Sequence, residues 1–289
     1  MASIHRKTLA VVVVLLLCMF AYGCSPVIRT GIRMAHPALE NIEASLFQQD
    51  NLVLAEQGLP GTIMLLEGML ESSPNDMLLQ TMAIKAYLGL GMLVEDKDPK
   101  QATALYTKGS EWGMAALKRH RKFRQACEEG MKIGEAAQLI TDKDYVPALL
   151  WTAACMGSNV LLNMGDPMIV VDLAAVKALA DQANMIDDDY FHGFAYIFIG
   201  TVNSILPATF GGDRNIARSA FETLDTMNKG NFLLAKVFFA KFYQTEDKLA
   251  KAAMQDVVDA PDKLMPEIEL MNQIAKSKAG QYLEAKEGV

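Results

Sequence analysis

The sequence is poor in the residues that enzymes use most often for acid–base and metal chemistry. Only four of its 289 residues are histidines, and His36, His120 and His192 are the ones beyond residue 24. It contains no Gly-x-Ser-x-Gly nucleophile elbow, no His-Glu-x-x-His motif and no phosphate-binding loop. We therefore expect a protein that is not an enzyme and that needs neither a cofactor nor a metal.

Positive charge is also in short supply. The chain has 27 Lys and Arg residues against 34 Asp and Glu residues, which gives a formal net charge of -7. Nucleic-acid binding requires a basic face that neutralises phosphates, so we expect no nucleic-acid partner. The one dense basic cluster, residues 118–124, falls in a predicted helix. We interpret it as a solvated helix face; the alternative is a docking surface for an acidic partner or for lipid head groups.

Cysteine is scarce as well, with four in the chain. Beyond residue 24 only Cys127 and Cys155 remain, and a single pair does not make a disulfide framework. Both lie in apolar, helical stretches. We therefore expect two buried free thiols, and the alternative is a bridge between them in an oxidising compartment.

The N-terminus carries the pattern of a bacterial lipoprotein signal peptide. Basic residues 5–7 precede an apolar run over residues 9–20, which is shorter than the roughly 20 residues that a membrane-spanning helix needs. Small residues then lead to Cys24, and a cysteine in this place is the site of acylation. We predict a signal peptide over residues 1–23 and palmitate-type acylation of Cys24. The protein would be periplasmic and anchored to the outer membrane, or to the inner one; an ordinary secretory leader and a retained membrane helix are the alternatives.

The rest of the chain has the pattern of one all-α domain. Residues 24–37 end at a proline and are predicted to be a tether, and residues 38–289 show the 3.6-residue period of helices without sustained strand-like alternation. Helix starts are indicated at Pro60-Gly61, Asp76 and Asp98-Pro99. Such boundary signals predict about eleven or twelve helices joined by short turns.

Small and large residues recur at the spacing of a tetratricopeptide (TPR) repeat, in which close helix packing requires a small, a large and a second small residue before a proline. The spacing occurs at Thr62, Leu66, Met69 and Pro74, at Ala102, Tyr106 and Gly109, and at Ala217 and Phe221. We predict TPR-like helix-turn-helix repeats that form a compact α-solenoid. The concave surface of such a solenoid would bind a peptide, a protein or a small ligand.

Two segments of the C-terminal half are candidate sites. Residues 211–214, Gly-Gly-Asp-Arg, fit a tight turn with Asp213 as helix N-cap, and an anion-binding nest is the alternative. Asp187–Asp189 and His192 have a spacing suited to a metal, but helix capping by Asp is the favoured interpretation. The aromatic residues within 194–198 and 232–243 are interpreted mostly as core, although a hydrophobic ligand channel would use the same residues.

Three motifs of this half carry a family resemblance. They are Asp188-Asp189-Tyr190-Phe191-His192-Gly193, Leu206-Pro207-Ala208-Thr209-Phe210-Gly211-Gly212-Asp213-Arg214 and Gly230-Asn231-Phe232-Leu233-Leu234. In order and spacing they resemble the T-component (TatT) lipoproteins of TRAP transporters. The resemblance covers residues 186–285, and extends loosely to the front half through the leader and the Pro74-Asn75 turn.

The resemblance implies a periplasmic, membrane-tethered accessory subunit that associates with the solute-binding (P) subunit of a tripartite ATP-independent (TRAP) transporter. It also implies a homotrimer with a pore through each protomer, and the handling of an organic acid or another small ligand. The alternative is a general TPR scaffold lipoprotein for protein contacts in the envelope. The candidate ligand- or partner-binding residues are Tyr190, His192, Tyr196, Pro207, Phe210, Gly211, Gly212, Asp213 and Arg214.

Overall fold

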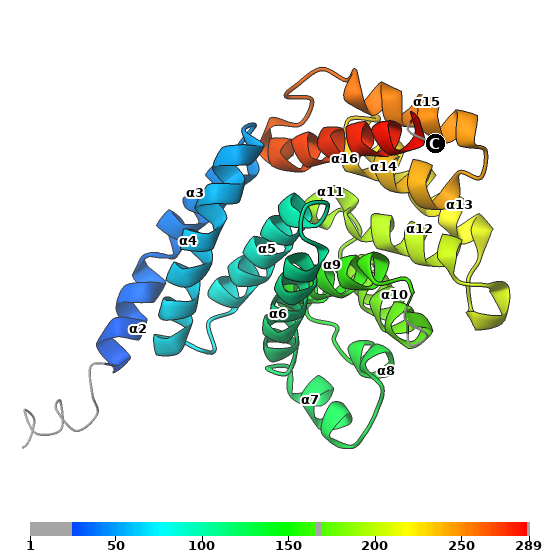
Figure 1. The fold of residues 1–289 in the computed structure, drawn as a ribbon. Coiled ribbons are helices and arrows are strands. Elements are labelled where there is room, and N and C mark those ends of the chain that lie inside the picture. Colours follow the sequence, from blue (N-terminus) through cyan, green and yellow to red (C-terminus); the bar gives the residue numbers. More distant parts are fainter. Residues whose placement is uncertain (1–24, 166–168, 288–289) are drawn as a thin grey trace, which may run out of the picture.

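The structure, a computed structural model, describes residues 25–165 and 169–287. These residues form helices joined by turns and contain no strand, so the all-α prediction is confirmed (Figure 1). Among them, twelve α-helices are eight residues or longer, in agreement with the number expected from the boundary signals. The predicted signal peptide, residues 1–23, and the predicted lipidation site, Cys24, lie outside the described residues.

The first three helices are α2 (Ser25–Met34), α3 (His36–Phe47) and α4 (Leu52–Ser72). The segment predicted to be a tether is therefore helical from Ser25 onward. Ile32 is buried, and Arg29 Nε donates a hydrogen bond to the Ser72 carbonyl at 3.1 Å. The segment is part of the folded domain because α2 contacts α4 and buries Ile32. The ending at Pro37 did not reveal this packing.

Helix α4 begins earlier than the sequence pattern indicated. Asn51 is its N-cap, with the side-chain oxygen accepting from Leu54 N at 3.1 Å, whereas Pro60 lies inside the helix. The predicted start at Pro60-Gly61 is wrong. Proline removes one backbone donor, and an exposed position such as that of Pro60 tolerates this because water can reach the freed carbonyl.

The middle of the domain consists of α5 (Met77–Val94), α6 (Pro99–Leu117), α9 (Val146–Leu162) and α10 (Ile169–Ile186), packed in sequence. Asp76 and Asp98 cap α5 and α6 as predicted, each accepting from a backbone N–H three residues on. Close packing of α6 on α9 requires Gly109, because a Cβ there would lie 2.6 Å from Cys155 Sγ. Both Cys127 and Cys155 are free thiols, the first half-buried and the second buried.

Two segments in this region are long and apolar enough to cross a membrane, α5 and Lys143–Leu162. Within the described residues, these are the two segments with that length and hydropathy. The fold buries 72% of the first segment and 67% of the second. Such burial is what core helices of a folded domain show.

Between α6 and α9 the chain makes an excursion through α7 (Arg121–Glu128), α8 (Ile133–Ala137) and a 3₁₀ turn (Lys143–Tyr145). The prediction that the basic cluster at residues 118–124 lies in one helix is wrong. The cluster spans the break between α6 and α7, because His120 caps α7 and its Nδ1 accepts from Phe123 N at 3.3 Å. Histidine is an uncommon helix cap, so this break was hard to predict from the sequence.

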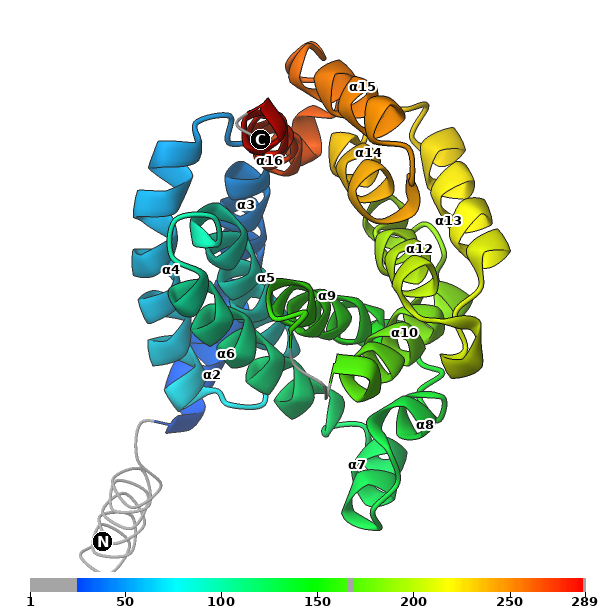
Figure 2. The ribbon, with the colours of Figure 1, turned by 45° about the vertical axis from the view of Figure 1, so that its right-hand side comes forward.

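The C-terminal part contains α11 (Tyr190–Gly193), α12 (Ala195–Ile205), α13 (Arg214–Met227), α14 (Leu233–Phe238), α15 (Asp247–Val258) and α16 (Glu269–Glu287). Short turns at Ala208–Phe210 and Pro266–Ile268 are 3₁₀, and Phe239–Tyr243 is a π-helical turn. Figure 2 shows the helices following one another around a ring. Helix α16 closes the ring, since it contacts α14 and α15 as well as α3 and α4.

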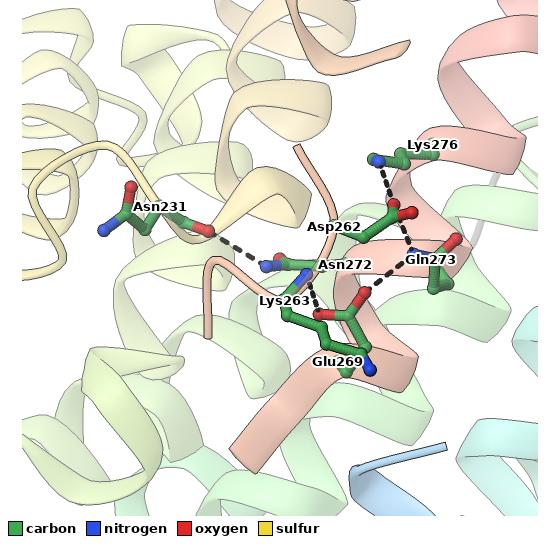
Figure 3. Close-up of polar contacts among 7 residues, drawn as sticks. All are labelled: Asn231, Asp262, Lys263, Glu269, Asn272, Gln273 and Lys276. Atoms are coloured by element: carbon green, nitrogen blue, oxygen red, sulfur yellow. Dashed lines mark hydrogen bonds and ion pairs between the residues drawn. The ribbon is translucent and has the colours of Figure 1, made fainter. Parts of the chain in front are cut away.

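A buried polar network fixes the start of α16 (Figure 3). Asn272 accepts a hydrogen bond from Leu233 N at 2.9 Å and donates one to the Asn231 carbonyl at 3.0 Å. Glu269 accepts from Lys263 N at 2.9 Å, and Asn272 and Glu269 are 2% and 1% exposed. Because these groups are buried, the network sets where the rest of α16 lies relative to α14.

Candidate ligand cavity

A cavity of about 360 Å³ lies between the C-terminal ends of α5 and α9, the segment from α14 to the π-helical turn, and the last turns of α16. Its apolar walls come from Met92, Leu161, Leu162, Val237, Phe238, Phe242, Met254, Tyr282 and Ala285. Its polar lining is Glu95, Asp96, Ser158, Lys241, Lys278 and Gln281. Apolar walls with a few polar groups at one place are typical of small-molecule sites.

The π-helical turn and Phe238, the last residue of α14, divide four aromatic residues between the cavity and the packing on α13. Turns of this kind occur often at functional sites. Phe238 and Phe242 line the cavity, and their ring centres are 5.6 Å apart. Phe239 and Tyr243 instead pack on Phe221, with ring centres 5.6 and 6.3 Å from it. Two of the four aromatic residues thus belong to the cavity and two do not.

An ion-pair cluster forms one wall of the cavity. Lys278 Nζ pairs with Glu95 and lies 3.6 Å from Asp96 Oδ2, while Glu95 also accepts a hydrogen bond from Tyr106. The side chains of Lys278 and Glu95 are only 13% and 19% exposed. Burial and the neighbouring Glu95 raise the pKa of Tyr106 well above its ordinary value, so the phenol keeps its proton and donates. Each member of the cluster is therefore satisfied by another.

Lys241 differs from Lys278 in lacking such a partner. It lies on the exposed side of the π-helical turn, with Nζ 5.3 Å from the ring centre of Phe242. No carboxylate of the described residues forms a salt bridge with it. Lys241 is thus the cation at this cavity that is available to an anionic ligand.

A second hollow, of about 40 Å³, continues along the same faces of α5 and α16. It is bordered by Lys85, whose Nζ lies 3.0 Å from Glu43 Oε2 and 5.3 Å from the ring centre of Trp151. On α16 the residues that line the two hollows are Leu270, Met271 and Ile274, then Lys278, Gln281, Tyr282 and Ala285. This helical spacing puts both hollows in one row.

Three of the residues singled out from the sequence gather at α11. Tyr190 accepts a hydrogen bond from Trp151 Nε1 at 3.2 Å, and burial raises the pKa of Tyr190 to about 12. His192 has a left-handed backbone (φ 60°), and its ring lies 3.8 Å from Glu267 Oε1. Tyr196 is half-buried at the start of α12. The motif around Tyr190 therefore shapes a strained turn against the core.

Asp187–Asp189 do not act as the helix cap that the sequence suggested. Asp189 precedes α11 but its side chain makes no capping hydrogen bond, so this interpretation is wrong. Asp187 instead pairs with Lys143 at 2.9 Å, and this hydrogen bond lowers the pKa of Asp187. Within the described residues no three His, Cys, Asp or Glu side chains are grouped so as to hold a metal ion.

The other six singled-out residues form the turn before α13. Asp213 accepts from Asn215 N at 2.7 Å and from Ile216 N at 3.3 Å, so the interpretation as an N-cap is confirmed. Phe210 is 60% exposed, and Arg214 donates to the Tyr243 carbonyl at 2.8 Å.

The backbone of this turn is tight. The Pro207 carbonyl accepts hydrogen bonds from Phe210 N at 2.9 Å and from Gly212 N at 3.2 Å. Gly211 has φ 86°, and a Cβ on Gly212 would lie 1.8 Å from the Leu206 carbonyl oxygen. The turn leaves no room for a side chain at Gly212, whereas Gly211 has open space and needs only a residue that tolerates a left-handed backbone.

The structure does not bring these two groups together. Asp213 caps the first turn of α13, whereas Asn228, after its last turn, donates to the His192 carbonyl at 2.9 Å. A helix of 14 residues is about 21 Å long, which separates the groups by that length. None of the nine residues lines the 360 Å³ cavity.

Comparison with known families decides the affiliation. The family described as the TRAP transporter T-component matches residues 48–289. The chain belongs to this family. The match includes every element that lines the cavity, while α2 and α3 precede it. No curated protein matches the chain.

Membership makes this T-component part of a bacterial transporter system, as the resemblance of its motifs implied. The residues that the sequence reading missed are Glu95, Lys241 and Lys278. One signal for them existed, since Lys278 follows Met271 and Ile274 on the buried face of α16, where a lysine is out of place.

Proposed function

We propose that this T-component is an accessory subunit of a TRAP transporter that binds the P subunit and holds a small amphipathic organic acid in the 360 Å³ cavity. One observation supports this class of ligand: the cavity combines apolar walls with a lysine, Lys241, that lacks a carboxylate partner among the described residues. The protein would act by binding and not by catalysis.

The charges around the cavity restrict the ligand to one carboxylate. Lys278 is already neutralised by Glu95 and Asp96, so an anion at that wall would have to displace a buried carboxylate. Lys241 offers its charge at the rim without that cost. The ligand would therefore place its carboxylate at Lys241 and its apolar part against Phe238 and Phe242.

Calorimetric titration of the chain beginning at Ser25 with octanoate, and with octanol as the uncharged analogue, tests this proposal. Octanoate should bind more tightly than octanol, and Lys241→Gln should remove the difference, since an exposed charge contact is worth about 0.2–1 kcal/mol. Phe242→Ala should weaken both ligands. Phe210→Ala, in the turn before α13, is the matched control and should change neither. Loss of binding in Phe210→Ala but not in Phe242→Ala would move the site to that turn.

We propose that the protein assembles as a homotrimer through the outer face of α4. This face carries Val53, Leu54, Met64 and Leu65, which are 62%, 54%, 74% and 57% exposed. Gly61 and Gly68 lie on the same side with nothing within 4 Å of a Cβ, so another helix can approach closely. Sedimentation of the wild type and of Leu54→Glu/Met64→Glu tests the homotrimer, and a monomeric wild type contradicts it.

Pull-down with the purified P subunit, using the same variants, separately tests binding of the P subunit.

We further propose that Cys24 is acylated and that the protein is periplasmic. The support is the leader sequence and the match to the TRAP transporter T-component family. Labelled palmitate should enter the full chain and not the Cys24→Ser variant. Equal labelling of both would exclude acylation at this residue.

A further inference from the structure

Exposed basic residues gather at the start of α7, away from the cavity. We define the basic tip as Lys118, Arg121 and Lys122, which are exposed at the start of α7. No salt bridge links any of these three to another residue of the ranges 25–165 and 169–287. The exposed carboxylates Glu128 and Glu129 lie at the opposite end of α7, and Asp142 is paired with His120 at 3.1 Å. The three cations therefore form a positive surface on an acidic chain.

Helix stability does not explain this surface. Arg121 and Lys122 are the first two residues of α7, and the partial positive charge of a helix N-terminus disfavours cations there. Neither residue gains an ion pair in return. Their charges are directed to something outside the chain.

The position of the basic tip indicates what that is. Figures 1 and 2 are related by a rotation about the vertical axis, and both place α7 and the beginning of α2 toward the lower end of the molecule. Helix α2 begins at Ser25, and its neighbour Cys24 is one peptide unit, about 3.8 Å, away along the chain. An acyl chain on Cys24 would therefore bring the same end of the ring toward the bilayer.

We propose that the basic tip is a second membrane contact, which binds the head groups of anionic phospholipids and orients the anchored ring. This inference rests on the acylation of Cys24 that we propose above. Each lysine or arginine near an anionic membrane surface strengthens binding about fivefold, so the tip alone binds weakly. Anchoring at Cys24 makes the contact intramolecular and hence effective. The ring then meets the bilayer at two points, which restricts its rotation about the anchor.

Vesicle flotation of the chain beginning at Ser25 tests the basic tip without the anchor. The chain keeps the described core, which runs from Ile32 to Ala279. We expect it to float with vesicles containing phosphatidylglycerol more than with pure phosphatidylcholine, and to be released by salt. Arg121→Gln/Lys122→Gln should weaken this binding on the order of 25-fold. The control Lys248→Gln/Lys251→Gln removes two charges from α15, at the upper end of both views, and should bind as wild type does.

The two double variants have the same net charge, so a general charge effect would weaken both equally and overturn the proposal. Binding of Arg121→Gln/Lys122→Gln equal to wild type would also overturn it. Retention on immobilised polyglutamate without vesicle binding would make the tip a protein-docking surface instead. Misfolding is excluded by thermal unfolding, because removal of cations from the first turn of α7 should leave the melting temperature unchanged or higher. If the membrane contact of the basic tip is refuted in this way, the outcomes of the octanoate, P-subunit and palmitate experiments are unaffected.

Discussion

Replacement of Asn272 by alanine should lower the free energy of unfolding of the domain. The Asn272 side chain is 2% exposed and bonds both the Leu233 N–H and the Asn231 carbonyl, at 2.9 and 3.0 Å (Figure 3). Asn272→Ala leaves these backbone groups without their partner in a dry environment. Each buried unpaired group costs about 1–3 kcal/mol, so for the two groups we expect a loss of about 2–6 kcal/mol in the free energy of unfolding.

Urea unfolding of the chain beginning at Ser25, followed by circular dichroism, measures this loss by linear extrapolation. Gln125→Ala is the matched control, because that side chain is exposed on α7 and should change stability by less than about 0.5 kcal/mol. Asn272→Ala should also weaken octanoate binding, since α16 carries Lys278, Gln281 and Tyr282 into the cavity. If Asn272→Ala and Gln125→Ala unfold at the same urea concentration, the network does not hold α16 in place and our reasoning is wrong.

Three further predictions follow from particular contacts. Gly212→Ala should disrupt the turn before α13, because the new Cβ would meet the Leu206 carbonyl oxygen. Proteolysis within residues 206–214 should therefore become faster. Gly211→Asn should resist proteolysis as wild type does, because Gly211 has open space around it and asparagine tolerates a left-handed backbone. The folded-state pKa of Tyr190, about 12, exceeds its ordinary value of 10.0. The folded state therefore holds the proton longer, and the contribution of Tyr190 is complete below pH 10 and lost as the pH rises to about 12. Urea unfolding across this window should show a smaller decline in Tyr190→Phe; an equal decline refutes the assignment. In the native protein, a thiol reagent should modify Cys127 slowly and Cys155 only on unfolding, because Cys155 is buried and burial raises the pKa of its thiol. Rapid reaction of both thiols would contradict the packing of α9.

Sequence patterns were reliable where a local interaction decides the structure. Asp76, Asp98 and Asp213 each cap a helix through a hydrogen bond to a backbone N–H within three residues, and all three were recognised. The patterns failed where distant packing decides. Pro60 is tolerated within α4 because it faces outward, and Ser25–Met34 is helical because Ile32 is buried on packing. The capping interpretation of Asp189 failed because Phe191 and His192 adopt left-handed backbones against Trp151 and Asn228.

The sequence by itself determined the all-α class, the helix caps Asp76, Asp98 and Asp213 and, through motifs at residues 188–234, the T-component family. These depend on helical period and on short-range hydrogen bonds, both of which are written in neighbouring residues. The tertiary structure alone decided that α16 closes a ring, that Lys278 meets Glu95 across 183 positions of sequence, and that Phe242 but not Tyr243 faces the cavity. Such contacts depend on which helix faces pack together. The helical period shows which face of a helix is apolar, but it does not show which other helix packs against that face.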